Sequence, residues 1–306
     1  MSETDPQNIA YAWQQGARRP EPGLHLVATP IGAARDITLR ALDTLAGADA
    51  LAAEDTRTLR HLMEIHGIPL AGRLMIPYHD HNGEAARPRI MGLLAEGKSV
   101  AYASEAGTPM VADPGMKLAR AAVEAGYRVI AAPGASAVLT ALCVAGLPSD
   151  RFLFAGFPPP AAGARASWIA EIGAIPATIV LYESPKRIKR TLGELAQILG
   201  GKREAALCRE LTKRFEEVLR GTLDELVEKL GDDTVRGELV LVLDRPLEKV
   251  ADQGDLERAL REALAQSGAR VKTVANEVAA RFGLPKREVY QLALGLTEAQ
   301  GEETDD

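Results

Sequence analysis

The sequence predicts an α/β protein of two domains followed by a small helical segment, and three observations carry this prediction. From residue 24 to residue 145, short apolar runs that suit buried strands alternate with amphipathic runs that suit helices. A cluster of turn residues at 146–150 then opens a second region, in which this alternation breaks down. Beyond residue 250 only helical periodicity remains. We therefore expect a mostly parallel sheet, a second sheet of α+β character, and a packed group of helices.

The composition fits a globular chain with more than one core. The 306 residues are 46% hydrophobic and 25% charged, which is ordinary for a chain that folds into two domains. The predicted parts are a disordered polar extension at 1–23, an N-terminal α/β domain at 24–146, a C-terminal α/β (α+β) domain at 147–245, a helix-turn-helix-like segment at 250–296 and an acidic tail at 297–306.

Net charge and cysteine content limit the partners and the cellular compartment that we expect. A net charge of −6 argues against a general nucleic-acid coat, so any RNA or DNA contact must be local. The polar N-terminus lacks the apolar core of a secretory signal, and proline and glycine residues break the uncharged run at 129–148, so we expect no membrane segment. Cys143 and Cys208 lie far apart in apolar segments, which favours reduced core thiols in a cytoplasmic protein.

The elements of the first domain follow from these patterns. Strands are predicted at 24–28, 48–53, 74–77, 99–103 and 128–132. Helices are predicted at 36–47, 58–66, 84–96, 114–125 and 136–145. Asp36 has the residue type of an N-cap, so we place the start of the first helix there.

The second domain changes in character along its length. Strands are predicted at 152–157, 178–183, 205–209, 217–220 and 238–243, and helices at 164–172, 186–199 and 223–230. From residue 217 the order changes to strand, helix and strand, which suggests a sheet with at least one antiparallel pair.

The C-terminal segment reads as three helices. Leu256, Leu260 and Leu264 share one helix face, and a second apolar face follows before Gly283. Residues 275–292 resemble a helix-turn-helix with Gly283 at the turn, although a small capping bundle explains the same pattern.

The stretch at 100–115, VAYASEAGTPMVADPG, has the clearest pattern of a strand that ends in a ligand-binding loop. A short apolar strand runs into a loop of small and turn-forming residues, which leaves backbone groups uncovered at the carboxyl end of the strand. Similar junctions recur at 29–32, 133–137 and 182–185. Such loops suit an adenosine- or amino-acid-bearing ligand that is gripped by main chain.

Several common chemistries lack a sequence signal. The chain has no GxGxxG after a strand, no GxSxG elbow and no CxxC pair. His79 and His81 share a face if their segment is extended, but no further zinc ligands can be named, so we predict no metal site.

Eight segments carry a family resemblance. TPIGAARDITLRAL, AAEDTR, HDHN, SEAGTPMVADPG, PGAS, GLPSDRF, YESPKR and CRELTK occur in this order between residues 24 and 243. Together they resemble the ribosomal RNA small subunit methyltransferase I family, the 16S rRNA cytidine-2′-O-methyltransferases of the tetrapyrrole methylase superfamily. Three positions differ from that family's usual residues: Ala33-Ala34 stands where Asn-Leu is usual, Glu105 where Asp is usual, and Lys186 where His is usual.

The resemblance implies a two-domain tetrapyrrole-methylase-like fold, S-adenosylmethionine as cofactor, 16S rRNA in the small ribosomal subunit as partner, and a homodimer. Carried over by position, the cofactor-binding residues are Pro30, Gly32, Ser104, Glu105, Ala106, Gly107, Thr108, Pro133, Gly134, Ser136 and Ala137.

The expected reaction, 2′-O-ribose methylation, needs a proton acceptor and phosphate ligands. A ribose hydroxyl must lose its proton, and we select Glu210, Glu183 and, where desolvated, Lys186 as candidate catalytic residues. The candidate RNA-binding residues are Arg187, Lys213, Arg214, Lys286 and Arg287. Because only 4% of the residues are aromatic, no stacking platform for a base is evident.

Two other functions remain open at this point. One is a methyltransferase that acts on a carbon of a precursor tetrapyrrole, although the basic segment at 182–190 and the helical tail argue against it. The other is a DNA-binding regulator that uses residues 275–292 and senses a ligand through the α/β domains.

Overall fold

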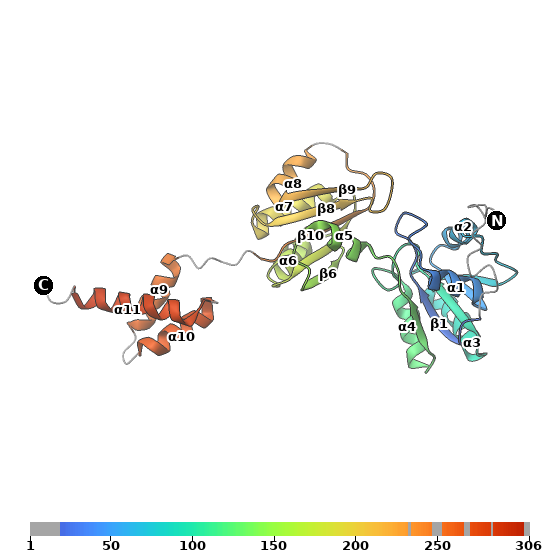
Figure 1. Ribbon diagram of the computed structural model, residues 1–306, viewed down its shortest axis with the longest axis horizontal. Coiled ribbons are helices and arrows are strands. Elements are labelled where there is room, and N and C mark those ends of the chain that lie inside the picture. Colours follow the sequence, from blue (N-terminus) through green and yellow to red (C-terminus); the bar gives the residue numbers. More distant parts are fainter. Residues whose placement is uncertain (1–18, 232–233, 247–252, 266–269, 283, 303–306) are drawn as a thin grey trace, which may run out of the picture. The chain divides into compact units, whose positions relative to one another are not determined.

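The computed structural model (Figure 1) describes residues 19–231, 234–246, 253–265, 270–282 and 284–302. The chain divides into two compact units, Met1–Arg245 and Pro246–Asp306. Residues 1–18 lie outside the described residues, so the predicted disorder of the N-terminal extension stays a prediction there. Next to them, Arg19 forms an ion pair with Asp49.

The first sheet contains five parallel strands in the order β3-β2-β4-β1-β5. They are β1 (Gly23–Val27), β2 (Ala50–Ala53), β3 (Leu74–Pro77), β4 (Ser99–Ala103) and β5 (Val129–Ala132). The helices that connect and follow them are α1 (Leu39–Gly47), α2 (Thr56–Ile65), α3 (Gly83–Ala95), α4 (Gly115–Glu124) and α5 (Ala137–Ala145). This confirms the predicted alternation.

Both faces of this sheet are covered, which explains why its central strands are apolar throughout. Residues of α1 and α2 pack against one face, and residues of α3 and α4 pack against the other. Every residue of β1 and β4 is buried as a result. The carboxyl ends of these central strands therefore sit on a rigid base.

The start of α1 corrects the prediction. Asp36 lies in a turn, where its N–H donates to the carbonyl of Ala33. The helix begins at Leu39, and Thr38 is its N-cap, because its hydroxyl accepts a hydrogen bond from the N–H of Ala41 at 3.2 Å.

The second sheet contains β6 (Phe152–Gly156), β7 (Thr178–Glu183), β8 (Glu204–Arg209), β9 (Glu217–Thr222) and β10 (Leu239–Leu243). Their order is β6-β7-β10-β8-β9, and every neighbouring pair except β6 and β7 is antiparallel. The expected antiparallel pairing is thus confirmed. Helices α6 (Ala162–Gly173), α7 (Ile188–Leu199) and α8 (Leu223–Leu230) share one core with this sheet.

Helix α5 lies against the opposite face of the second sheet. Its buried residues Val138, Ala141 and Leu142 pack with Val180 of β7 and Val240 of β10. The sequence groups α5 with the first domain, but its mostly apolar surface is buried against the second sheet. Helix α5, which follows the last strand of the first sheet, is therefore part of the core of the second sheet.

The C-terminal unit contains α9 (Gln253–Leu264), α10 (Val271–Phe282) and α11 (Lys286–Glu302). Leu256 and Leu260 of α9, Val274 and Val278 of α10, and Val289 of α11 are buried in one shared core. This confirms three helices. The predicted turn residue Gly283 and the end of the tail at 303–306 lie outside the described residues.

The two cysteines differ in burial. Cys143 and Cys208 are both free, and Cys208 is buried. Cys143 is exposed, which corrects its expected place in the core, because α5 turns it away from the second sheet.

None of the described helices is long and apolar enough to cross a lipid bilayer.

Candidate active site

The loops that follow β1, β4 and β5 are hydrogen-bonded to one another. Thr29 and Gly107 form an isolated antiparallel bridge, with N–H to carbonyl distances of 2.9 and 3.0 Å. The hydroxyl of Thr108 donates to the carbonyl of Ala135 at 2.9 Å, and that of Ser104 donates to the carbonyl of Gly107 at 2.6 Å. Because Gly107 has a φ of +79°, a residue with a side chain would be strained in this loop.

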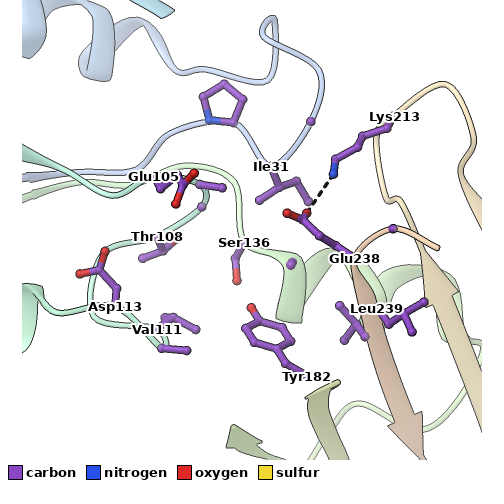
Figure 2. Close-up of a pocket in the computed structure, with 18 of the residues that line it drawn as sticks. Ile31, Glu105, Thr108, Val111, Asp113, Ser136, Tyr182, Lys213, Glu238 and Leu239 are labelled. Atoms are coloured by element: carbon purple, nitrogen blue, oxygen red, sulfur yellow. Dashed lines mark hydrogen bonds and ion pairs between the residues drawn. The ribbon is translucent and has the colours of Figure 1, made fainter. Parts of the chain in front are cut away.

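A cavity of about 670 Å³ lies beside these loops (Figure 2). Its lining comes from both sheets: the loops after β1, β4 and β5 and the start of α5 on one side, and residues of β7 and β10 with the turns next to them on the other. Ser136, at the N-cap of α5, makes no side-chain capping bond, so its hydroxyl is available to the cavity. The size suits a small-molecule ligand.

The turn after β8 closes one side of this cavity against the loop after β1. A Cβ atom placed on Gly32 would lie 2.6 Å from Thr212 Oγ1 and 3.0 Å from the carbonyl oxygen of Leu211, so a larger residue here would force this turn to shift. The N–H of Ala33 donates to Thr212 Oγ1 at 3.1 Å. In this turn Glu210 and Thr212 have φ values of +50° and +63°. The strained turn and the glycine loop therefore hold each other in place.

Lys213 lies at the cavity wall between two carboxylates. Its Nζ is 3.0 Å from Glu210 and 2.9 Å from Glu238, and Figure 2 shows the contact with Glu238. The N–H of Glu238 donates to the carboxylate of Glu210, and this bond, with the Lys213 ammonium, holds the pKa of Glu210 below its usual value. Glu210 is thus an ionised partner of Lys213 at neutral pH.

The cavity has an acidic end at the carboxyl edges of β2 and β4. Glu54 follows β2 and lines the cavity, whereas its neighbour Asp55 caps α2 by accepting from the N–H groups of Arg57 and Thr58. Burial, followed by the charge of Asp113, raises the pKa of Glu54. The carboxylate of Asp113 accepts from the Tyr102 hydroxyl at 2.9 Å through Oδ1.

Asp113 keeps one acceptor unused. Its Oδ2 is buried and makes no hydrogen bond within the described part of the chain, although the residue lines the cavity. An unpaired buried acceptor is costly, so this oxygen favours a ligand that brings a donor.

Most of the predicted cofactor residues line the cavity. These are Pro30, Gly32, Glu105, Ala106, Gly107, Thr108, Ser136 and Ala137. The other three are not among the described lining residues. Ser104 is 5% exposed and supports the loop from inside, the carbonyl of Pro133 accepts from the Thr38 hydroxyl, and Gly134 packs closely on Ala28.

The three predicted catalytic residues lie in different surroundings. Glu183 lines the cavity, but its carboxylate is fully buried and accepts from the N–H of Ser184 at 2.7 Å and the hydroxyl of Thr191 at 2.6 Å. Glu210 is paired with Lys213. Lys186 is exposed and is not among the described lining residues, so the desolvation that its role requires is not met.

The predicted RNA-binding residues are also divided. Arg187 is used inside the protein, because its guanidinium pairs with Glu183 at 3.1 Å and donates to the carbonyl of Pro158. This placement differs from that expected of a free phosphate ligand. Arg214 is exposed beside the Phe215 ring, and Lys286 and Arg287 are exposed at the start of α11.

The residues selected from the sequence leave out four side chains of the lining that carry chemistry: Glu54, Asp113, Tyr182 and Glu238. Glu54, Asp113 and Tyr182 lie within the motifs AAEDTR, SEAGTPMVADPG and YESPKR, so these motifs were the available signal. Burial and the charge of Glu238 raise the pKa of Tyr182 to about 12, so its hydroxyl keeps its proton at neutral pH.

The two histidines considered for a metal site lie outside the large cavity. No group of three His, Cys, Asp or Glu side chains placed to hold a metal ion occurs within the described ranges. His79 and His81, with ring centroids 6.1 Å apart, instead line a separate small cavity of about 140 Å³ together with Arg87 and Lys117.

Comparison with known proteins identifies the class of protein that has this fold. The family model described as Tetrapyrrole (Corrin/Porphyrin) Methylases matches residues 23–227. A solved uroporphyrin-III C-methyltransferase from Thermus thermophilus, complexed with S-adenyl homocysteine, covers 72% of this chain and 97% of its own, with 20% identity and a TM-score of 0.51. The fold is therefore that of the tetrapyrrole methylases.

The curated relatives narrow this class. Proteins named Ribosomal RNA small subunit methyltransferase I from Mesorhizobium japonicum and Halalkalibacterium halodurans are 45% and 40% identical to this chain. The matches cover 94% and 88% of this chain and 96% and 93% of those relatives. A second family model, described as the RsmI C-terminal HTH domain, matches residues 250–297. The chain belongs to the ribosomal RNA small subunit methyltransferase I family.

Methyltransferases of this family use S-adenosylmethionine, and the lining fits this cofactor in two respects. Small residues in the loops after β1, β4 and β5 leave main-chain groups open to a ligand. The carboxylates of Glu54, Glu105 and Asp113 suit a ligand that carries a sulfonium and an ammonium group, and Asp113 Oδ2 offers an unused acceptor.

Proposed function

We propose that the chain transfers a methyl group from S-adenosylmethionine to the 2′-hydroxyl of a cytidine in 16S rRNA of the small ribosomal subunit. The observation that carries this proposal is the match over nearly the whole chain to relatives named as small-subunit rRNA methyltransferases. A cavity that fits the cofactor supports it. Neither alternative, a precursor-tetrapyrrole C-methyltransferase or a DNA-binding regulator, is favoured by these names.

The cofactor supplies a methyl group on a positively charged sulfur. The protein's part is to hold the acceptor oxygen in line behind that methyl group and to exclude water, because an in-line displacement depends mainly on position. The interlocked loops at Gly32 and Gly107 provide a fixed wall for this purpose. The apolar floor at Leu239 and Val240, which are 3% and 5% exposed, keeps that side of the cavity dry.

We assign the proton acceptor for the ribose hydroxyl to Glu54. Glu54 lines the cavity, and its pKa is raised by burial and by Asp113, which makes its carboxylate a better proton acceptor near neutral pH. By contrast, the carboxylate of Glu183 is occupied by internal donors, and the pKa of Glu210 is lowered. Among the described carboxylates of the cavity, Glu54 therefore has the best combination of position and basicity.

We also propose which residues contact the rRNA, and the compartment and oligomeric state in which the protein acts. Exposed Lys286 and Arg287 on α11 suit phosphate contacts with rRNA, and the acidic character of the rest of the chain keeps such contacts local. We further propose a cytoplasmic homodimer, which light scattering of the purified protein at micromolar concentration tests. A monomer under those conditions would count against the dimer.

The acceptor is tested by supplying three substrates in parallel. Purified protein and methyl-labelled S-adenosylmethionine are incubated with 30S particles, with naked 16S rRNA and with precursor tetrapyrroles. We expect label in the 30S particles and none in the tetrapyrroles. Label in a tetrapyrrole alone would overturn the proposed function.

A further inference from the structure

An exposed aromatic side chain lies at the opening of the cavity. Phe157 lines the cavity yet is 56% exposed, whereas Leu239 and Val240 in the same lining are buried. Its ring centroid is 5.4 Å from that of Tyr182, with an angle of 63° between the planes. Tyr182 packs in turn against Phe154 at 4.8 Å. Phe157 thus packs on Tyr182, which also lines the cavity, while Phe154 supports Tyr182 from outside the described lining.

The segment that carries Phe157 leaves its strand abruptly. The register between β6 and β7 shifts between Phe154 and Gly156, and Gly156 has a φ of +71°. Three prolines follow directly at 158–160, which restrict the backbone beyond Phe157. The ring is therefore set off the sheet edge by a bulge and a stiff segment.

Two arginines hold the carbonyl groups of this proline segment. Arg187 donates to the carbonyl of Pro158, and Arg165 donates to those of Pro159 and Pro160 at 3.1 and 2.8 Å. Both arginines are anchored by carboxylates, Arg187 by Glu183 and Arg165, which is 1% exposed, by Glu194. Arg165 and Glu183 are the buried members of these pairs, and a buried charge is costly unless it has a partner of opposite charge.

This bracing indicates a function for the ring. A surface phenylalanine on an ordinary loop needs no buried ion pairs to fix it, whereas a binding platform gains affinity when it is held in advance. A flat apolar ring has no hydrogen-bonding group, so it does not select a phosphate or a sugar hydroxyl. It suits the π-face of a nucleobase, and bases that are recognised singly are commonly stacked on aromatic side chains.

We propose that Phe157 is the platform on which the base of the target nucleotide stacks while its ribose enters the cavity, and that the Glu183–Arg187 and Arg165–Glu194 pairs are positioning residues for it. The proposal rests on the proposed function, since it takes an RNA nucleotide as the acceptor. The proposal differs from the expectation, drawn from the low aromatic content, that no stacking platform is evident.

The test compares ring variants on the full-length protein. Phe157→Ala and Phe157→Leu remove the ring, and Phe157→Leu keeps apolar bulk, while Phe157→Tyr keeps the ring. Steady-state methylation of 30S particles should show KM raised roughly 10- to 100-fold in the first two variants and restored in Phe157→Tyr. The dissociation constant of S-adenosylmethionine, measured by calorimetry, should stay at the wild-type value in all three.

The matched control is Phe152→Ala. Phe152 begins the same strand, is 43% exposed and does not belong to the described lining of the cavity, so this variant should keep the wild-type KM. Circular dichroism and thermal unfolding of each variant separate a loss of folding from a loss of stacking.

Three results would overturn the inference. The first is a wild-type KM for 30S particles in Phe157→Ala. The second is a loss of cofactor affinity in that variant with KM unchanged, which would place the ring against the cofactor. The third is a dimer that becomes a monomer in that variant, which would place the ring in a subunit interface. A wild-type protein that methylates no rRNA at all would instead refute the proposed function, so the two failures are distinguishable.

Discussion

Substituting Gly32 by alanine tests how tightly the cavity is closed. The added Cβ would lie 2.6 Å from Lys213 Cγ and from Thr212 Oγ1, and 3.0 Å from the main-chain carbonyl of Leu211. The lysine side chain can move aside, but the carbonyl and the hydroxyl belong to a turn fixed by the sheet. Because Gly32 does not need a positive φ, the effect of alanine here is steric alone.

The magnitude follows from the contacts. Inserting one methyl group into a packed site costs about 1–3 kcal/mol, and losing the hydrogen bond between Ala33 and Thr212 adds about 1 kcal/mol. If the loop stays in place, this cost lowers the free energy of unfolding. If the loop moves away, the cavity loses part of its wall, and S-adenosylmethionine should bind roughly 5- to 150-fold more weakly.

Urea denaturation and calorimetry measure these two outcomes. Gly92→Ala is the matched control, because Gly92 lies inside α3 with open space around its Cα, so alanine should raise the free energy of unfolding by about 0.5–1 kcal/mol and leave cofactor affinity unchanged. A Gly32→Ala protein with wild-type stability and wild-type affinity would refute the steric argument.

Four further predictions address the cofactor, the base, the pH dependence and the tail. Gly107→Leu should abolish S-adenosylmethionine binding in calorimetry, because its φ of +79° is strained for leucine and the side chain would occupy cofactor space; unchanged affinity would contradict this. Glu54→Gln should lower kcat at least 10-fold and remove the rise of kcat with pH that a carboxylate base with a raised pKa produces; a wild-type pH profile would exclude it as the base. The pKa of Glu210 is lowered from 4.5 by the N–H of Glu238 and the ammonium of Lys213, so its stabilising effect is present above pH 4.5 and is lost as the pH falls through the lowered pKa; denaturation should show a flatter pH dependence for Glu210→Gln in that range, and parallel curves would contradict it. Replacing Lys286 and Arg287 by alanine should leave cofactor affinity intact and make methylation of 30S particles weaker and less salt-dependent; identical salt curves would mean that α11 makes no phosphate contact.

The sequence predicts the parts of this site that are local. The apolar strand and glycine-rich loop at 100–115 are neighbours in the chain, so the pattern alone indicates both the buried strand and the open backbone beyond it. Eight of the cofactor residues carried over from the family resemblance line the cavity for the same reason, since they lie on loops at the ends of strands.

Contacts between distant segments were beyond this reasoning. Arg187 looks like a surface cation in sequence, yet it turns inward because Glu183 lies four residues before it and a proline carbonyl from another strand's loop meets it. Likewise Glu54 and Asp113 are 59 positions apart, and only the parallel packing of β2 beside β4 brings them to one edge. Helix α5 continues the first domain in sequence but packs on the second sheet, because its apolar face is satisfied there.

Nucleoside analysis shows directly whether this cavity serves methyl transfer to a ribose hydroxyl of rRNA. 30S particles from a strain that lacks the enzyme are treated with S-adenosylmethionine and either the wild-type protein or Gly107→Leu, and the 16S rRNA is digested to nucleosides for mass spectrometry. We expect 2′-O-methylcytidine in the wild-type sample and none in the Gly107→Leu sample. A methyl group found on a base, or no new methylated nucleoside with an active wild-type preparation, would contradict this expectation.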